Sequence, residues 1–202
     1  CGMFSASGTQ GGRMSGLDII GPEECRTLYG LFRERVRRSP EQCAYRDFDR
    51  SAKQWVDMSW SAFGREVARW QAALQSEGLK PGDRVALSLR NSAEWAVFEQ
   101  AALGLGLVVI SLYTDDRPDN AAYILQDSGA VLLLVQDAAH WRRLTPALAR
   151  FRELKIVLFG DPDASLTDPR IRWTSGWLPD EAGELTDDTG RPDDLATIAY
   201  TS

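Results

Sequence analysis

Pairs of carboxylates are the first residues whose types and spacing could do chemistry. Asp115-Asp116 follows an apolar run that predicts a strand, and so does Asp161-Pro162-Asp163. Carboxylate oxygens are the ligands that Mg²⁺ prefers, and parallel strands often present them at their ends. The same residues suit loop capping and solvation, which need no metal, and we favour that interpretation. The sequence therefore predicts no metal site.

The sequence also contains no clear set of residues for nucleophilic or general-base catalysis. His140 is the only histidine of the chain, and it lies on the polar side of a predicted helix without the partner that orients a catalytic histidine. No GxSxG elbow occurs, so a serine hydrolase is not indicated. Asp188-Thr189-Gly190 matches the tripeptide of aspartic proteases, but it lies in an acidic polar stretch and predicts a solvated turn. We predict no catalytic residue in this chain.

Two hydroxyl residues, Thr201 and Ser202, follow an apolar run at 196–200 that predicts a strand. In open parallel sheets, ligands bind beyond the carboxyl ends of the strands. The chain therefore reaches the expected position of a ligand site at its last two residues.

An alternation of strands and helices has to position these residues. Unbroken apolar runs such as LVVISL and VLLLV are typical of parallel strands that are buried on both faces. The pattern predicts strands at 84–89, 107–112, 131–135 and 155–159, and helices at 92–103, 118–126 and 138–150. The fold class is therefore α/β, with a mostly parallel sheet and helices on both faces.

Two further helices and a hairpin are predicted before this alternation begins. An apolar stripe of Leu28, Leu31, Phe32 and Val36 predicts a first helix that ends before Pro40. Strands at 43–47 and 54–59 flank a polar turn, which is typical of a hairpin. Ser59 can cap a second helix that Gly78 ends, and its inward side chains are predicted to be Phe63, Val67, Trp70 and Leu74.

Charge is concentrated in one segment. The formal net charge is −6, from 23 basic and 29 acidic residues, and the acidic loop 161–194 holds ten acidic side chains against three arginines. The rest of the chain is close to neutral, so no nucleic-acid partner is expected. Proline, glycine and threonine interrupt the acidic loop, which predicts a long solvated excursion with a short strand at 171–173.

Composition and cysteine usage bound the class of protein. The chain has 202 residues, of which 44% are hydrophobic and 26% charged, as in ordinary globular domains. Three widely spaced cysteines suggest neither a disulfide framework nor a zinc site, so a cytoplasmic location is expected. We predict a flexible N-terminal tail over 1–22 and one incomplete α/β domain over 23–202.

Several strings resemble one known family. Residues 82–86 (GDRVA) with Asn91-Ser92, residues 111–118 (SLYTDDRP), and residues 123–130 with YIL and SGA are similar to early segments of AMP-forming acyl-CoA synthetases. Residues 198–202 (IAYTS) resemble the opening of that family's phosphate-binding loop. The chain thus resembles the N-terminal part of the large domain of an adenylate-forming enzyme, and is most similar to the long-chain fatty acid:CoA ligase branch.

This resemblance implies a site and a reaction. Thr201 and Ser202 would begin the loop that contacts the ATP phosphates, with Tyr200 as the strand residue before them. Such enzymes use ATP and Mg²⁺ to convert a fatty acid into an acyl-adenylate, and CoA then displaces AMP. The remaining glycines of the loop and the catalytic lysine would lie beyond Ser202, so the chain alone is expected to be inactive and to bind no cofactor tightly.

The resemblance also carries expectations about partners, and it leaves alternatives open. Exposed apolar surface beside the last strand would favour self-association, and peripheral membrane contact is known in the long-chain branch. An aryl or amino acid activating ligase would share the same N-terminal pattern. A non-catalytic α/β binding or regulatory module, and a flavodoxin-like binder using the loop at 90–93, are the alternatives from other classes.

Overall fold

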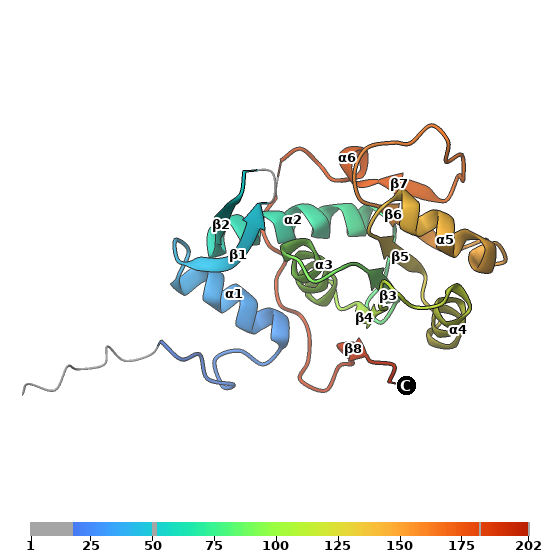
Figure 1. Cartoon of the computed structure of the whole chain (residues 1–202). Coiled ribbons are helices and arrows are strands. Elements are labelled where there is room, and N and C mark those ends of the chain that lie inside the picture. Colours follow the sequence, from blue (N-terminus) through green and yellow to red (C-terminus); the bar gives the residue numbers. More distant parts are fainter. Residues whose placement is uncertain (1–17, 50–51, 182, 202) are drawn as a thin grey trace, which may run out of the picture.

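A six-stranded sheet forms the centre of the molecule. The computed structural model describes residues 18–49, 52–181 and 183–201 (Figure 1). The order of strands across the sheet is β7-β6-β5-β3-β4-β8, and each neighbouring pair is parallel. The strands are β3 (Arg84–Ser88), β4 (Val108–Ser111), β5 (Leu132–Val135), β6 (Lys155–Leu158), β7 (Ile171–Trp173) and β8 (Thr197–Ile198).

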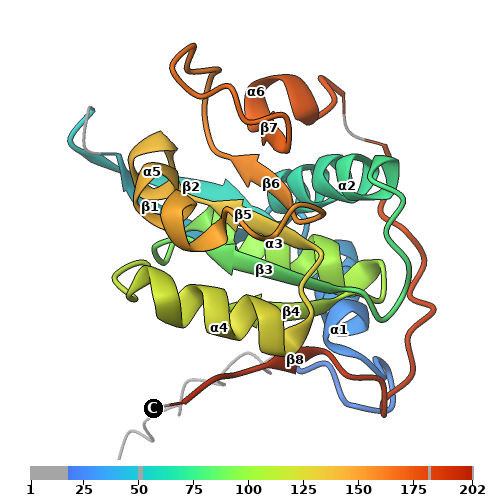
Figure 2. The ribbon, with the colours of Figure 1, turned by 90° about the vertical axis from the view of Figure 1, so that its right-hand side faces the viewer.

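Helices cover both faces of this sheet, because successive strand residues point to opposite sides. Val85 and Leu87 of β3 belong to one hydrophobic cluster, whereas Ala86 between them belongs to the other. The first cluster is covered by α1 (Leu28–Arg38), α2 (Trp60–Ser76) and α3 (Ala93–Gly104), and the second by α4 (Pro118–Ser128) and α5 (Ala138–Leu148). Figure 2 shows the sheet between α4 and α5 on one side and α2 and α3 on the other. The predicted α/β class is confirmed.

The N-terminal hairpin and the second helix also follow the prediction. Strands β1 (Cys43–Asp49) and β2 (Gln54–Ser59) pair in antiparallel fashion. Ser59 caps α2 by accepting a hydrogen bond from the amide of Ala62, and Gly78 ends the helix in a left-handed conformation with φ of 72°. The four side chains predicted to face inward on α2 are all buried.

The predicted inward face of α1 is confirmed for Phe32, which is buried, and for Val36, which packs against the first cluster, but it is wrong for the two leucines. Leu28 and Leu31 are 57% and 41% exposed, and the buried residues are Tyr29 and Phe32. The helix is rotated because the Tyr29 ring packs into the first cluster while its hydroxyl reaches polar partners at 3.0 Å (Gln71 Nε2) and 2.9 Å (the Thr186 carbonyl). Counting apolar residues favoured the leucines and overlooked the tyrosine.

The acidic loop is not the solvated excursion that its composition predicts. It contains β7 at the predicted place and a short helix α6 (Thr174–Trp177), and the Trp177 ring packs 5.6 Å from that of Trp70. Further along, the amide of Thr186 donates to Gln71 Oε1 at 3.0 Å, and the Thr186 hydroxyl donates to the carbonyl of Gly104 at 3.2 Å. The loop is thereby bound to α1, α2 and α3, while most of its charged side chains stay exposed.

The segment before α1 is described from Asp18 onward, and residues 1–17 of the predicted tail lie outside the described residues. The Asp18 carboxylate pairs with Arg35 and with Arg38, each at 3.0 Å. Among the described residues, we find no helix with the length and apolar character needed to cross a bilayer.

Candidate functional site

The chain connections place a crevice between β3 and β4. The connection from β3 to β4 runs through α3 on one face, and the connection from β4 to β5 runs through α4 on the other. The loops that follow these two neighbouring strands therefore leave in opposite directions, which is the switch point where open α/β sheets bind ligands. A cavity of about 580 Å³ lies there, bounded by residues 89–91 after β3 and by residues 111–114 at the end of β4.

The last described strand forms the third side of this cavity, which we call the switch-point pocket. Strand β8 pairs with β4 through Thr197 opposite Val109 and Ile198 opposite Ile110. Residues 197–200 all line the pocket, and Thr201 follows directly and is exposed. Ser202, the other predicted phosphate contact, lies outside the described residues.

Tyr200 is bound to α4 through its side chain. Its phenol hydroxyl donates to Asp127 Oδ2 of α4 at 2.7 Å, and its ring packs against the second cluster. The carboxylate of Asp127 accepts the hydrogen bond of the neutral phenol, and this bond, together with partial burial, raises the pKa of Tyr200. Tyr200 thus ties the strand end to α4, and a role in phosphate contact for it stays a prediction.

Sequence reasoning missed two pocket residues on α3. Trp95 and Glu99 lie one helical turn apart on a largely apolar helix, and both line the switch-point pocket. Glu99 is half-buried, and this burial raises the pKa of its carboxyl group. A carboxylate among alanines and aromatic residues was the only local signal, because no motif spacing marks it.

The loop at 90–93, weighed as a phosphate cradle for a flavodoxin-like binder, is occupied by local structure. The Ser92 hydroxyl caps α3 by accepting from the amide of Trp95 at 3.3 Å. The amide of Arg90 donates to Gln136 Oε1 at 3.1 Å. The Arg90 amide, one donor that a phosphate could use, is therefore already bonded to a protein atom.

The remaining candidates do not join the pocket. His140 is half-buried at the start of α5 rather than on the surface, and burial, helped by the charge of Arg143, lowers its pKa. Asp163 pairs with Arg142 and accepts from Ser165. Asp188, predicted in a solvated turn, accepts a hydrogen bond of 2.7 Å from Thr27, the cap of α1. In the described part of the chain, no three His, Cys, Asp or Glu residues are arranged to hold a metal ion.

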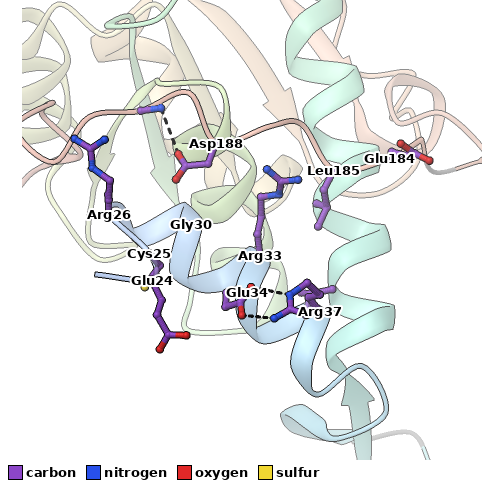
Figure 3. Close-up of a pocket in the computed structure, with 12 residues that line it drawn as sticks. Glu24, Cys25, Arg26, Gly30, Arg33, Glu34, Arg37, Glu184, Leu185 and Asp188 are labelled. Atoms are coloured by element: carbon purple, nitrogen blue, oxygen red, sulfur yellow. Dashed lines mark hydrogen bonds and ion pairs between the residues drawn. The ribbon is translucent and has the colours of Figure 1, made fainter. Parts of the chain in front are cut away.

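A second hollow of about 640 Å³ lies between α1 and residues 184–190 (Figure 3). Its basic side chains are Arg26, which lies just before α1, and Arg33 and Arg37 of α1, and acidic residues line the same hollow. Arg37 makes hydrogen bonds of 2.8 and 2.6 Å with Glu34, and Arg33 pairs with Asp187 at 3.2 Å. This exposed, charge-balanced hollow shares no lining residue with the switch-point pocket.

Comparison with known proteins gives a consistent result. The family model described as "AMP-binding enzyme" matches residues 32–202. The long-chain-fatty-acid–CoA ligase FadD15 of Mycobacterium bovis is 28% identical over 153 residues, which is 73% of this chain and 25% of the ligase. Gramicidin S synthase 2 of Brevibacillus brevis is 27% identical over 175 residues, 87% of this chain and 3% of the synthase. The chain thus spans about a quarter of the ligase that it matches.

A solved structure agrees with the sequence relatives. The Mycobacterium tuberculosis fatty acyl CoA synthetase superimposes with a TM-score of 0.65 at 25% identity, over 86% of this chain and 32% of the synthetase. The shared part contains the parallel sheet and its covering helices.

Proposed function

The chain belongs to the AMP-binding enzyme family, and we propose that it supplies the phosphate-binding edge of an ATP-dependent ligase that activates fatty acids. One observation carries this proposal. Strand β8 brings Thr201 to the rim of the switch-point pocket, where two loops diverge and leave space for a ligand. Hydroxyl and backbone N–H groups at the end of a strand can bind phosphate oxygens, so Thr201 and Ser202 would contact the ATP phosphates.

The proposed reaction has two steps. A carboxylate oxygen of the acid attacks the α-phosphorus of ATP, the bond to the bridging oxygen breaks, and pyrophosphate leaves. The sulfur of CoA then attacks the acyl carbon of the adenylate, and AMP leaves. Mg²⁺ would neutralise charge on the phosphate oxygens.

The substrate class rests on the relatives. The mycobacterial ligase and the mycobacterial synthetase are both named for fatty acyl substrates, and they match this chain at 28% and 25% identity. The main alternative is another adenylating ligase, acting on an amino acid or an aryl acid. It is supported by the similar identity, 27%, to gramicidin S synthase 2.

The test is a substrate panel on the natural gene product that contains this sequence, taken at full length. Pyrophosphate release from ATP is measured with fatty acids of six to eighteen carbons, with aryl acids and with amino acids. We expect release with fatty acids and, after addition of CoA, the matching thioester. Release only with amino or aryl acids would replace the proposed substrate, and no release with any acid would refute the proposed function.

Two matched variants and the isolated chain connect this test to the structure. Thr201→Val removes the hydroxyl and should weaken the use of ATP. Thr167→Val makes the same change at an exposed position of the acidic loop and should not. The isolated 202-residue chain is expected to release no pyrophosphate. Release by that chain, or equal activity of both valine variants, would show that the phosphates bind elsewhere.

A further inference from the structure

The strand that precedes Thr201, β8, is held to the sheet by a short backbone ladder. Strand β8 has two residues, and its ladder to β4 consists of the pairs Thr197–Val109 and Ile198–Ile110, extended by a hydrogen bond of 2.9 Å from the amide of Val109 to the carbonyl of Ala196. Neither Thr197 nor Ala199 is buried. Backbone pairing of this extent restrains the start of the segment and leaves its carboxyl end, where Thr201 lies, to be fixed by side chains.

Tyr200 provides such a side-chain contact. Its hydroxyl donates to Asp127 Oδ2 at 2.7 Å, and its ring packs against the second hydrophobic cluster beside Ile198. Ile198 and Tyr200 are two residues apart and pack against the same cluster. The alternation of an extended chain would therefore turn the side chain of Thr201 away from α4.

Asp127 lies on a part of α4 that is itself held in place. The helix ends at Gly129, whose left-handed conformation, with φ of 64°, terminates it sharply. Arg84 of β3 donates from Nε to the carbonyl of Ser128 at 2.9 Å and from Nη2 to the carbonyl of Gly129 at 3.2 Å. The end of α4 is thus bonded to the strand at the centre of the sheet, and the position of Asp127 is fixed relative to the switch-point pocket.

We infer that Tyr200 is a positioning residue, which through Asp127 holds the end of β8 so that Thr201 meets the ATP phosphates. This inference rests on the proposed function. Tyr200 acts through its neighbours and does not touch the reacting atoms. The contact needs a neutral phenol and an oxygen acceptor at position 127, since the hydroxyl is the donor and the carboxylate the acceptor.

The experiment uses the full-length natural gene product and compares Tyr200→Phe, Asp127→Ala and Asp127→Asn with the unmodified protein. Loss of one exposed hydrogen bond to a carboxylate should raise the KM for ATP by roughly threefold to tenfold, with a smaller change in kcat. The amide oxygen of Asp127→Asn still accepts the hydroxyl proton and should restore the KM. Tyr123→Phe, on an exposed tyrosine of the same helix, is the control. An unchanged KM in both Tyr200→Phe and Asp127→Ala would overturn the inference, and so would an Asp127→Asn variant that resembles Asp127→Ala.

A second readout separates this inference from the proposed function. Amide hydrogen exchange of residues 196–201 should become faster in Tyr200→Phe and Asp127→Ala, and should stay unchanged in Asp127→Asn and Tyr123→Phe. If the unmodified protein activates no acid but this exchange pattern is found, the proposed function fails and the Tyr200–Asp127 contact is supported. If the protein is active and exchange is equal in all variants, the contact is overturned.

Discussion

Gly104→Ala tests whether the acidic loop is fastened to the helices as the structure shows. Gly104 is the last residue of α3, and a Cβ placed there would lie 2.2 Å from Gln71 Nε2 and 2.6 Å from the Tyr29 ring. Both side chains are 1% exposed, and both are hydrogen-bonded to Thr186. The added methyl group must therefore displace buried side chains that hold the acidic loop.

The expected change in the free energy of unfolding is the sum of two destabilising contributions and one stabilising contribution. Forcing a methyl group into a packed site costs about 1–3 kcal/mol. Displacement of Gln71 weakens its hydrogen bonds to Tyr29 and Thr186, which each contribute about 1 kcal/mol. The better helix propensity of alanine returns about 1 kcal/mol or less at a helix end. We therefore expect the free energy of unfolding to fall by about 2–4 kcal/mol.

Urea unfolding of the two proteins, followed by tryptophan fluorescence and by far-UV circular dichroism, measures this loss. Gly176→Ala is the matched control, because Gly176 is an exposed helical glycine whose added Cβ would meet no atom within 4 Å. It should be neutral or slightly stabilising. Gln71→Ala removes the amide that the new methyl group would strike, so the double variant should lose less than the sum of the single losses. A Gly104→Ala protein as stable as the control would refute the reasoning.

Two further predictions concern charged groups at helix ends. Burial raises the pKa of Glu77, but hydrogen bonds from Lys155 (2.8 Å) and Trp177 (2.9 Å) outweigh it and hold the pKa below 4.5. The ionised form then stabilises the fold above pH 4.5, and this stability is lost as the pH falls through the lowered pKa. The urea midpoint is measured at pH 7 and at about one pH unit below 4.5, and the difference between the two should be smaller in Glu77→Gln than in the unmodified protein. An equal difference in both proteins would contradict the assignment. Asp137 caps α5 by accepting a hydrogen bond of 2.7 Å from the amide of His140, so Asp137→Ala should lower the free energy of unfolding by about 1 kcal/mol. The control Asp180→Ala, at an exposed position, should change the free energy of unfolding by less than about 0.5 kcal/mol. Equal losses of the two variants in urea unfolding would contradict the capping role.

The parallel sheet could be predicted because its signal is local. Strands such as β5 are buried on both faces and consist of unbroken apolar residues, and α2 begins at its Ser59 cap and ends at Gly78 as predicted. The inward face of α1 could not be predicted in the same way. Its orientation depends on Gln71 and Thr186, which lie 42 and 157 residues from Tyr29 in the sequence.

The candidate site was predictable only in part. The last strand is a local feature, so its place could be predicted, whereas phosphate contact by Tyr200, Thr201 and Ser202 stays a prediction. The pocket itself depends on the order of strands, because residues 89–91 and 111–114 become neighbours only when β4 lies beside β3. Glu99 enters the site from the side of a helix, and its half-buried state is a property of that packing.

The path of the acidic loop links the contacts of α1 to the position of the last strand. Thr186 is bonded to α1, α2 and α3, and eleven residues later the chain pairs with β4 at Thr197. A loop held at Thr186 can explore less space than one solvated along its whole length, so the entropy lost when β8 joins the sheet is smaller. Three partly buried polar contacts outside the switch-point pocket therefore favour the short strand that carries Thr201. Composition points to a solvated loop, whereas these contacts make the loop part of what positions the site.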